Sequence, residues 1–325
     1  MNFTPNYLHQ IIPEENFTEE IGKIADQLAL HAHTGYFTAF DGLSLYYEYY
    51  LAENSRATIV IVHGLSEFTK KFQEAAWYFL NQGYNVFIYD QRCHGFSDRL
   101  TDELDMIHVD RFSDYVKDLS KFIDTVVTPN QDKPLYLYSH SMGGAVSLMY
   151  MAENPDKIQK AVLSAPLFEV CAVDLPYFLI QSAVTLGKWF IGSKKRFFSC
   201  RDFDPDIPFS RSSDKSQARF TYYLSLRKAE PMYRTTPMTY GWTNECLKVK
   251  NKLLRKSFIA KIKTPILMII AEKDTVVKTA PQYAFAEKCS SCKAVTIPEG
   301  NHGMLAGTPE TITRHIKETL NFFQD

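Results

Sequence analysis

The chain has 325 residues, 45% of them hydrophobic, and carries 36 Lys and Arg against 37 Asp and Glu, a formal net charge of −1. This length and apolar content suffice for one large domain with an insertion. The balanced charge excludes the strongly basic composition typical of nucleic-acid-binding proteins, so we expect no nucleic acid among the partners.

The start of the chain and its cysteines predict a location. Residues 1–5 show no basic stretch followed by an apolar core, so we expect no secretory signal peptide. The six cysteines are scattered without the spacing of a disulfide framework, and we expect free thiols in a cytoplasmic protein. Cys289 and Cys292 have C-x-x-C spacing but follow a predicted helix, which makes a redox role the lesser alternative.

The first third of the chain alternates between predicted strands and helices. Residues 35–40 and 43–51 flank an Asp-Gly pair, which predicts a β-hairpin. Apolar strands and helical patterns then alternate from residue 57 to 166. Such alternation predicts a parallel, doubly wound sheet with right-handed crossovers.

The alternation stops after residue 166 and resumes only at Pro265, an interval far too long for a loop inside a compact domain. We therefore expect three parts in the chain. They are an N-terminal helical lead (1–33), an α/β core (34–166 and 264–325) and an inserted cap (167–263).

The most informative segment is residues 134–144, an apolar, aromatic-rich run that ends at Ser141 and is followed by two glycines and a helical pattern. A sharp strand-to-helix turn holds a serine hydroxyl rigidly and aims the N–H groups of the helix at a developing oxyanion. Ser139 stands where the Gly-x-Ser-x-Gly pattern has its first glycine, yet a small residue is kept. We predict that Ser141 is a nucleophile; the alternative is a serine in an ordinary turn.

Two later strand ends offer a carboxylate and a base. The buried strand from Pro265 ends in a polar loop with Glu272 and Asp274, and its tip position favours Asp274. The last predicted strand leads to His302, which is followed by Gly303 and lies outside any apolar periodic segment. Together with the serine, the chain order is nucleophile, acid, base, as in α/β-hydrolases and unlike the chymotrypsin or subtilisin order.

The oxyanion hole of such a fold takes one N–H from the residue after the nucleophile and one from the loop after the third strand. These positions correspond to Met142 and Leu65, the latter at the end of the fully apolar run that starts at Ala57. We interpret His63 as a residue that holds this loop through ring hydrogen bonds; a role in proton transfer is the lesser alternative.

These motifs resemble the monoacylglycerol lipase and bacterial lysophospholipase branch of the α/β-hydrolases, often called serine-aminopeptidase-like hydrolases. The resemblance extends over about residues 35–325 apart from the insertion, and it is carried by residues 63–67, 90–97, 140–144, 271–274 and 300–302. It implies an α/β-hydrolase fold, with a mostly parallel doubly wound sheet and an inserted helical cap.

From the residues and the resemblance together we expect a serine esterase that cleaves lysophospholipids or monoacylglycerols through an acyl-enzyme. The sequence has no Gly-x-x-x-x-Gly-Lys-[Ser/Thr] loop and no zinc-like Cys/His spacing, so we expect neither a cofactor nor a metal. A small-ester carboxylesterase, an aminopeptidase and a non-catalytic binding protein on the same fold are the alternatives. Acyl transfer to an acceptor other than water is left open.

Two segments of the expected cap are candidates for lipid contact. Residues 175–191 are apolar but interrupted by polar residues, so they predict a helix packed on the core or, alternatively, an acyl-chain wall or lipid-contacting surface. Residues 248–263 are basic and amphipathic, which predicts a solvated helix face or, alternatively, attraction to an anionic phosphate. Peripheral contact with the inner membrane surface is therefore left open.

Overall fold

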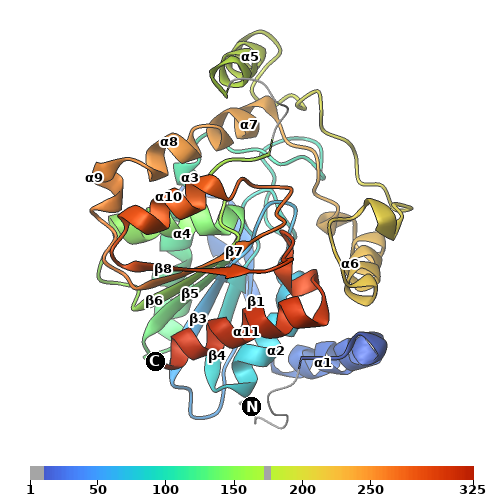
Figure 1. Ribbon diagram of the computed structural model, residues 1–325. Helices are drawn as coiled ribbons and strands as arrows, with labels where there is room; N and C mark the ends of the chain where they lie inside the picture. The colour runs from blue at the N-terminus through green and yellow to red at the C-terminus, as the bar shows by residue number, and fades with distance from the viewer. Residues whose placement is uncertain (1–10, 172–176) are drawn as a thin grey trace.

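One eight-stranded sheet organises the molecule, in the order β1-β2-β4-β3-β5-β6-β7-β8 (Figure 1). The computed structural model describes residues 11–171 and 177–325. The pairs β1–β2 and β2–β4 are antiparallel, and every other pair of neighbours is parallel, which confirms the predicted mostly parallel sheet. The strands are β1 (His33–Thr38), β2 (Ser44–Tyr50), β3 (Ala57–Val62), β4 (Tyr84–Tyr89), β5 (Leu135–His140), β6 (Lys160–Ser164), β7 (Ile266–Ala271) and β8 (Cys292–Ile297).

The burial of each strand follows from its place in the sheet. Every residue of β3, β4 and β7 is buried, as expected for strands covered by helices on both faces. The edge strands β1 and β8 are mostly exposed or half-buried instead, and each has a single buried residue. The predicted hairpin joins β1 to β2, and the Ala39 N–H donates to the Leu43 carbonyl at 2.8 Å across its turn.

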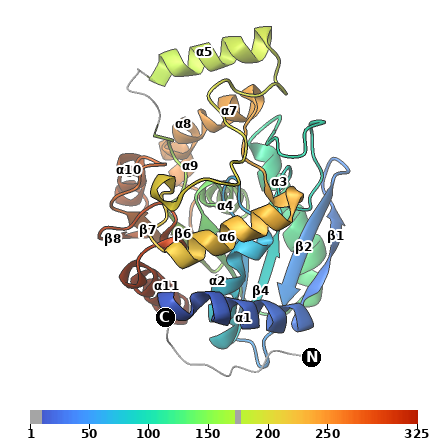
Figure 2. The same ribbon diagram turned by 90° about the vertical axis from the view of Figure 1, so that its right-hand side faces the viewer.

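Helices cover the two faces of the sheet as two separate apolar layers (Figures 1 and 2). On one face lie α1 (Phe17–His31), α2 (Gln73–Asn81) and α11 (Pro309–Gln324). On the other lie α3 (Ser113–Phe122), α4 (Met142–Glu153) and α10 (Ala280–Lys288). Within the segment expected as a helical lead (1–33), of which residues 1–10 lie outside the described part of the chain, α1 buries Phe17, Ile21, Ile24 and Leu28 along one stripe.

Between β6 and β7 the described residues form helices and contribute no strand to the sheet. These helices are α5 (Tyr177–Phe190), α6 (Gln217–Ala229), α7 (Tyr240–Cys246), α8 (Val249–Leu253) and α9 (Lys256–Ile259). Helices α7 to α9 bury Trp242, Val249, Leu253, Phe258 and Ile259 in the same cluster as α4. Helix α6 runs beside α1, whereas α5 lies at the far end of the insertion, next to α7 (Figure 2).

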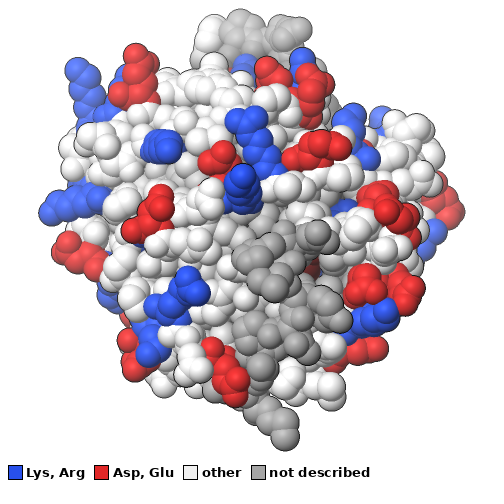
Figure 3. Space-filling view, turned by 60° about the horizontal axis from the view of Figure 1, so that its bottom comes forward, with Lys and Arg blue, Asp and Glu red and all other residues white. Residues whose placement is uncertain are grey.

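Helix α5 accounts for most of the apolar stretch predicted at 175–191; residues 175 and 176 lie outside the described part of the chain. Within residues 11–171 and 177–325, no helix has both the length and the apolar content needed to cross a bilayer. On the face seen in Figure 3, acidic and basic side chains are interspersed, in keeping with the net charge of −1.

Candidate active site

The turn between β5 and α4 holds Ser141 in a backbone conformation that few residues other than glycine adopt, with φ 51° and ψ −117°. Three backbone hydrogen bonds fix this conformation. The Ser141 N–H donates to the Ser164 carbonyl at 3.0 Å, and the Ser141 carbonyl accepts from Gly144 at 2.9 Å and from Leu167 at 2.8 Å. The serine is thus held rigidly at the start of a helix.

Close packing explains the small residues around this turn. A Cβ atom added to Gly143 would lie 2.0 Å from the Val62 carbonyl oxygen, so only glycine lets α4 approach β3 this closely. Ser139, at the position of the first glycine of the pattern, is fully buried, and its Oγ lies 2.6 Å from Ser147 Oγ. The extra hydroxyl therefore has a partner in α4, and the departure from glycine leaves no unpaired polar group there.

The structure brings Ser141, His302 and Asp274 together at the carboxyl ends of β5, β8 and β7. His302 Nε2 lies 2.9 Å from Ser141 Oγ, and His302 Nδ1 lies 2.8 Å from Asp274 Oδ2. The other oxygen of Asp274 accepts hydrogen bonds from the N–H groups of Val276 and Val277 at 2.8 and 2.9 Å. A carboxylate held in this way orients the imidazole so that Nε2 faces the serine hydroxyl.

The surroundings set the protonation of the two titrating groups. Burial alone would raise the pKa of Asp274, but the hydrogen bond and charge of His302 and the two backbone N–H groups outweigh it and lower the pKa below its usual value. Burial lowers the pKa of His302 despite the hydrogen bond to Asp274. The histidine is therefore neutral near pH 7, and its free Nε2 lone pair can accept the serine proton.

The neighbouring carboxylate that the sequence left as an alternative lies elsewhere. Glu272 Oε2 accepts the N–H of Glu299 at 3.1 Å, on the backbone of the turn before the histidine loop. Its place is thus beside the loop that carries His302, whereas the carboxylate that contacts the imidazole is that of Asp274.

The loop after β3 is held by a buried histidine. His63 Nδ1 lies 2.7 Å from the Gly64 carbonyl, and the Gln91 N–H donates to Nε2 at 2.9 Å. One ring nitrogen thus donates and the other accepts, as in a neutral imidazole, and burial lowers the pKa of His63 to about 4. The loop that carries Leu65 lies close to Ser141, since a Cβ added to Gly64 would be 3.1 Å from Ser141 Cβ.

Two polar residues beside the triad were given no catalytic role by the sequence. Glu67, three residues after Gly64, is 4% exposed, and it contacts His140, the residue before Ser141, at 2.9 Å. The signal in the sequence was a carboxylate two residues after Leu65, on the loop predicted to supply an oxyanion-hole N–H, and a histidine directly before Ser141.

Residues 11–171 and 177–325 contain no group of three or more His, Cys, Asp or Glu side chains that could hold a metal ion. All six cysteines are free thiols. Burial raises the pKa of Cys292 to about 12, which disfavours the thiolate that a redox-active cysteine needs.

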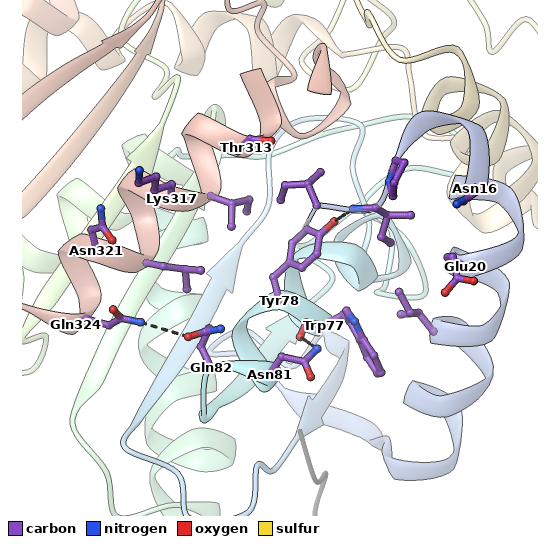
Figure 4. Close-up of a pocket in the computed structure, with 16 residues that line it drawn as sticks. Asn16, Glu20, Trp77, Tyr78, Asn81, Gln82, Thr313, Lys317, Asn321 and Gln324 are labelled. Atoms are coloured by element: carbon purple, nitrogen blue, oxygen red, sulfur yellow. Dashed lines mark hydrogen bonds between the residues drawn. The ribbon is translucent and has the colours of Figure 1, made fainter. Parts of the chain in front are cut away.

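A cavity of about 680 Å³ opens between α1, α2 and α11, on the face of the sheet covered by those helices (Figure 4). Trp77, Tyr78 and Ile316 contribute to its wall, and polar side chains such as Asn16 and Lys317 surround them. None of the three residues that meet at the strand ends lines this cavity. The cavity is thus separate from the candidate site, which the hydrogen-bonded Ser141, His302 and Asp274 place at the strand ends.

Comparison with known proteins identifies the family of the chain. Residues 53–309 match the family described as "Serine aminopeptidase, S33". The "Probable lysophospholipase L2" of Haemophilus influenzae is 25% identical over 296 residues, covering 89% of this chain and 91% of that protein. The "Monoglyceride lipase" of Rattus norvegicus is 31% identical over 283 residues, covering 86% of each chain.

Solved structures share the fold. A soluble variant of monoglyceride lipase from Saccharomyces cerevisiae, in complex with a substrate analogue, superposes with a TM-score of 0.72 at 19% identity and covers 90% of this chain and 94% of that one. A carboxyl esterase from Bacillus coagulans gives a TM-score of 0.73 at 14% identity, with 90% and 98% covered. The chain thus has the predicted α/β-hydrolase fold and belongs to the serine aminopeptidase S33 family.

Proposed function

We propose that the protein is a serine hydrolase that cleaves carboxylic esters of lipid-like substrates, lysophospholipids or monoacylglycerols, through an acyl-enzyme. The observation that carries this proposal is the continuous hydrogen-bonded chain from Ser141 through His302 to Asp274, with distances of 2.9 and 2.8 Å. This series of hydrogen bonds ends at a serine in a strained, fixed turn, and such an arrangement activates a hydroxyl for attack on a carbonyl carbon.

The reaction proceeds in two halves. His302 Nε2 takes the proton from Ser141 as Oγ attacks the ester carbonyl carbon, which gives a first tetrahedral intermediate. This intermediate collapses with cleavage of the ester C–O bond, the imidazolium gives its proton to the departing alkoxide oxygen, and the acyl-enzyme remains. Water then gives a proton to the same nitrogen as it attacks the acyl carbon, and the collapse of this second intermediate releases the acid and restores the serine hydroxyl. Asp274 remains ionised throughout and holds Nδ1–H.

The backbone N–H groups of Leu65 and Met142 are the proposed oxyanion hole. Met142 is the first residue of α4, where the helix dipole favours negative charge, and Leu65 lies on the loop held by His63. Loss of one such donor typically costs about 3 kcal/mol of transition-state stabilisation.

The proposed substrate class rests on two observations. The sequence relatives include proteins named lysophospholipase L2 and monoglyceride lipase. In addition, α5 and the segment after it expose Trp189, Phe190 and Phe198 at 80% or more of their surface, next to Lys188. Exposed aromatic residues beside lysines suit the interface of an anionic lipid layer.

We accordingly propose that residues 167–263 act as a cap over the strand ends and that α5 touches lipid peripherally. The alternative phosphate-binding role of residues 248–263 receives less support. That segment forms α8 and α9, whose apolar side is buried in the core, and the Lys250 ammonium lies 2.7 Å from Glu169 Oε2. These contacts are those of a helix face that covers the core.

A labelling experiment tests the reaction. A fluorophosphonate probe should label the wild type and the control Ser225→Ala, which changes an exposed serine of α6, but not Ser141→Ala. Equal labelling of Ser141→Ala would end the serine-hydrolase proposal.

A substrate panel tests the specificity. Lysophospholipids, monoacylglycerols, short p-nitrophenyl esters and aminoacyl amides are compared by kcat/KM under the same conditions. The proposal requires the two lipid classes to exceed the short esters. A preference for short esters would indicate a carboxylesterase, and a preference for amides with a free α-amino group would indicate a peptidase.

A further inference from the structure

The carboxylate of Glu67 has three partners around the active site. Its Oε2 accepts the N–H of Gly64 at 2.5 Å and lies 2.9 Å from His140 Nδ1, while its Oε1 lies 2.7 Å from the ammonium of Lys71. Every one of these partners is a donor, so Glu67 is ionised. Burial alone would raise the pKa of Glu67, but the charges and hydrogen bonds of His140 and Lys71 hold this pKa well below its usual value.

Both ring nitrogens of His140 face acceptors. Nδ1 faces the Glu67 carboxylate, and Nε2 lies 3.1 Å from the backbone carbonyl oxygen of His302. An imidazole can satisfy two acceptors only when both nitrogens carry a proton, which makes His140 an imidazolium. Burial alone would lower the pKa of His140, but the Glu67 carboxylate outweighs it and raises this pKa.

The pair thus touches both of the loops that surround the nucleophile. Glu67 contacts the loop after β3, through the Gly64 N–H that precedes Leu65. His140 contacts the loop after β8, through the carbonyl of His302, and its ring centroid lies 5.0 Å from that of His302. His140 itself is joined covalently to Ser141.

We propose that Glu67 and His140 form a positioning pair. The pair holds the oxyanion-hole loop after β3 and the His302 loop after β8 at a fixed distance and orientation relative to each other. This inference rests on the proposed function of Ser141 and His302. The pair does not exchange protons with the substrate; it acts through the Gly64 N–H and the His302 carbonyl. Positioning of this kind matters because catalytic groups lose rate when they move by more than about 0.5 Å.

The charge of His140 also acts on the base. A cation beside His302 disfavours a second imidazolium and adds to the lowering of the His302 pKa by burial. The other charged or titrating groups that influence His140 and His302 are Glu67, Lys71, Asp214, Asp274, His63 and His315. Replacing His140 by a neutral residue should therefore raise the pKa of His302.

The test compares Glu67→Gln, His140→Gln and the double variant with the wild type on p-nitrophenyl butyrate. Rates are divided by the amount of serine labelled with a fluorophosphonate, so that misfolded molecules are not counted. We expect kcat to fall about 10- to 100-fold in each single variant, with KM changed less than about threefold, because the pair affects alignment and not substrate binding. The double variant should be no slower than the slower single variant, since the residues act as a unit.

The pH profile separates positioning from a merely structural role. In His140→Gln, the acid limb of kcat/KM should move to higher pH, since the loss of a neighbouring cation raises the pKa of His302. The matched control is Asp118→Asn, which changes a fully buried carboxylate whose hydrogen bonds come from Arg92 and not from Glu67, His140 or the triad. It should lower stability but leave both the rate per labelled serine and the acid limb unchanged.

Two outcomes would overturn the inference. One is a rate per labelled serine within about threefold of the wild type in both single variants. The other is an equal loss of rate in Asp118→Asn. If Glu67→Gln does not fold, the inference is tested by His140→Gln alone, through its rate per labelled serine and the position of the acid limb of kcat/KM. A wild type that neither reacts with the probe nor cleaves the ester would instead overturn the proposed function.

Discussion

The guanidinium of Arg219, on α6, donates two hydrogen bonds to the carboxylate of Glu74, on α2, at 2.6 and 3.0 Å. Both side chains are almost fully buried, with 1% and 3% of their surfaces exposed. Arg219 also donates to the Ile12 carbonyl at 3.0 Å and lies 3.3 Å from Glu14, in the segment that leads into α1. Helix α6, between β6 and β7, is thereby joined to α2 and to the segment before α1 at one buried point.

Removing the arginine should be costly for stability. We expect Arg219→Ala to lower the free energy of unfolding by about 3 to 5 kcal/mol, because it leaves the Glu74 charge buried without its cation. Urea denaturation followed by circular dichroism measures this loss. The control Arg211→Ala removes an arginine that is 55% exposed, and it should cost less than about 1 kcal/mol. Equal losses in the two variants would contradict the role given to the buried pair.

The assignment of the carboxylate can be tested by two neighbouring substitutions. Asp274→Asn should lower kcat by about four powers of ten, because the amide no longer holds His302 in the tautomer with a free Nε2. Glu272→Gln should keep a rate within about threefold of the wild type, since its carboxylate contacts backbone and not the imidazole. Thermal unfolding of both variants checks that they fold. A larger loss of kcat in Glu272→Gln would reverse the assignment.

The pH dependence of activity should follow His302. Its pKa is lowered from 6.5 chiefly by burial, and only the neutral ring can accept the serine proton. The rate should therefore be retained as the pH falls to 6.5 and be lost only when the pH falls through the lower pKa of the folded enzyme. A profile of kcat/KM against pH on a non-ionising ester measures this limb. A limb centred above pH 6.5 would contradict the expectation.

A second histidine should make stability depend on pH. His315 on α11 is fully buried, its Nε2 lies 2.8 Å from the Tyr138 hydroxyl, and burial lowers its pKa to about 3. In the unfolded chain a histidine titrates near 6.5, so the unfolded state binds the proton first as the pH falls. This group therefore contributes stability above pH 6.5 that is lost progressively as the pH falls toward 3. Between pH 7 and pH 5 the loss should be about 2 kcal/mol.

The variant His315→Leu isolates this contribution. Its free energy of unfolding should fall less between pH 7 and pH 5 than that of the wild type, by about the same 2 kcal/mol. Urea titrations at the two pH values measure the difference, and comparing differences removes any change in packing common to both. An identical loss of unfolding free energy between pH 7 and pH 5 in the two proteins would show that His315 does not take up a proton on unfolding.

Much of the fold could be predicted because its determinants are local. The apolar runs at β3 and β7 are buried on both sides, which makes them continuous rather than alternating, and an Asp-Gly pair marks the hairpin. The turn at Ser141 was recognisable for the same reason, since strand, small residues and helix follow one another within a dozen positions.

Contacts between distant segments could not be predicted. Nothing in the composition around Arg219 distinguishes it from the exposed arginines, and its partners lie 145 and 205 positions away. The role of His140 was hidden likewise, because the sequence does not show that Glu67 and the His302 carbonyl flank its ring. The burial of Phe17 was hidden as well: it is completely buried because Tyr222 and Arg219 of α6 pack on its ring.

The contact between the hydroxyls of Ser139 and Ser147 should restrict which substitutions these two positions accept during evolution. Ser139→Gly would give the common form of the motif, but it would leave the Ser147 hydroxyl buried without a partner, a loss of about 1 to 3 kcal/mol. Ser147→Ala alone would likewise leave the buried hydroxyl of Ser139 without a hydrogen-bond partner. The two positions should therefore covary among descendants of a common ancestor, changing together or through an intermediate of reduced fitness.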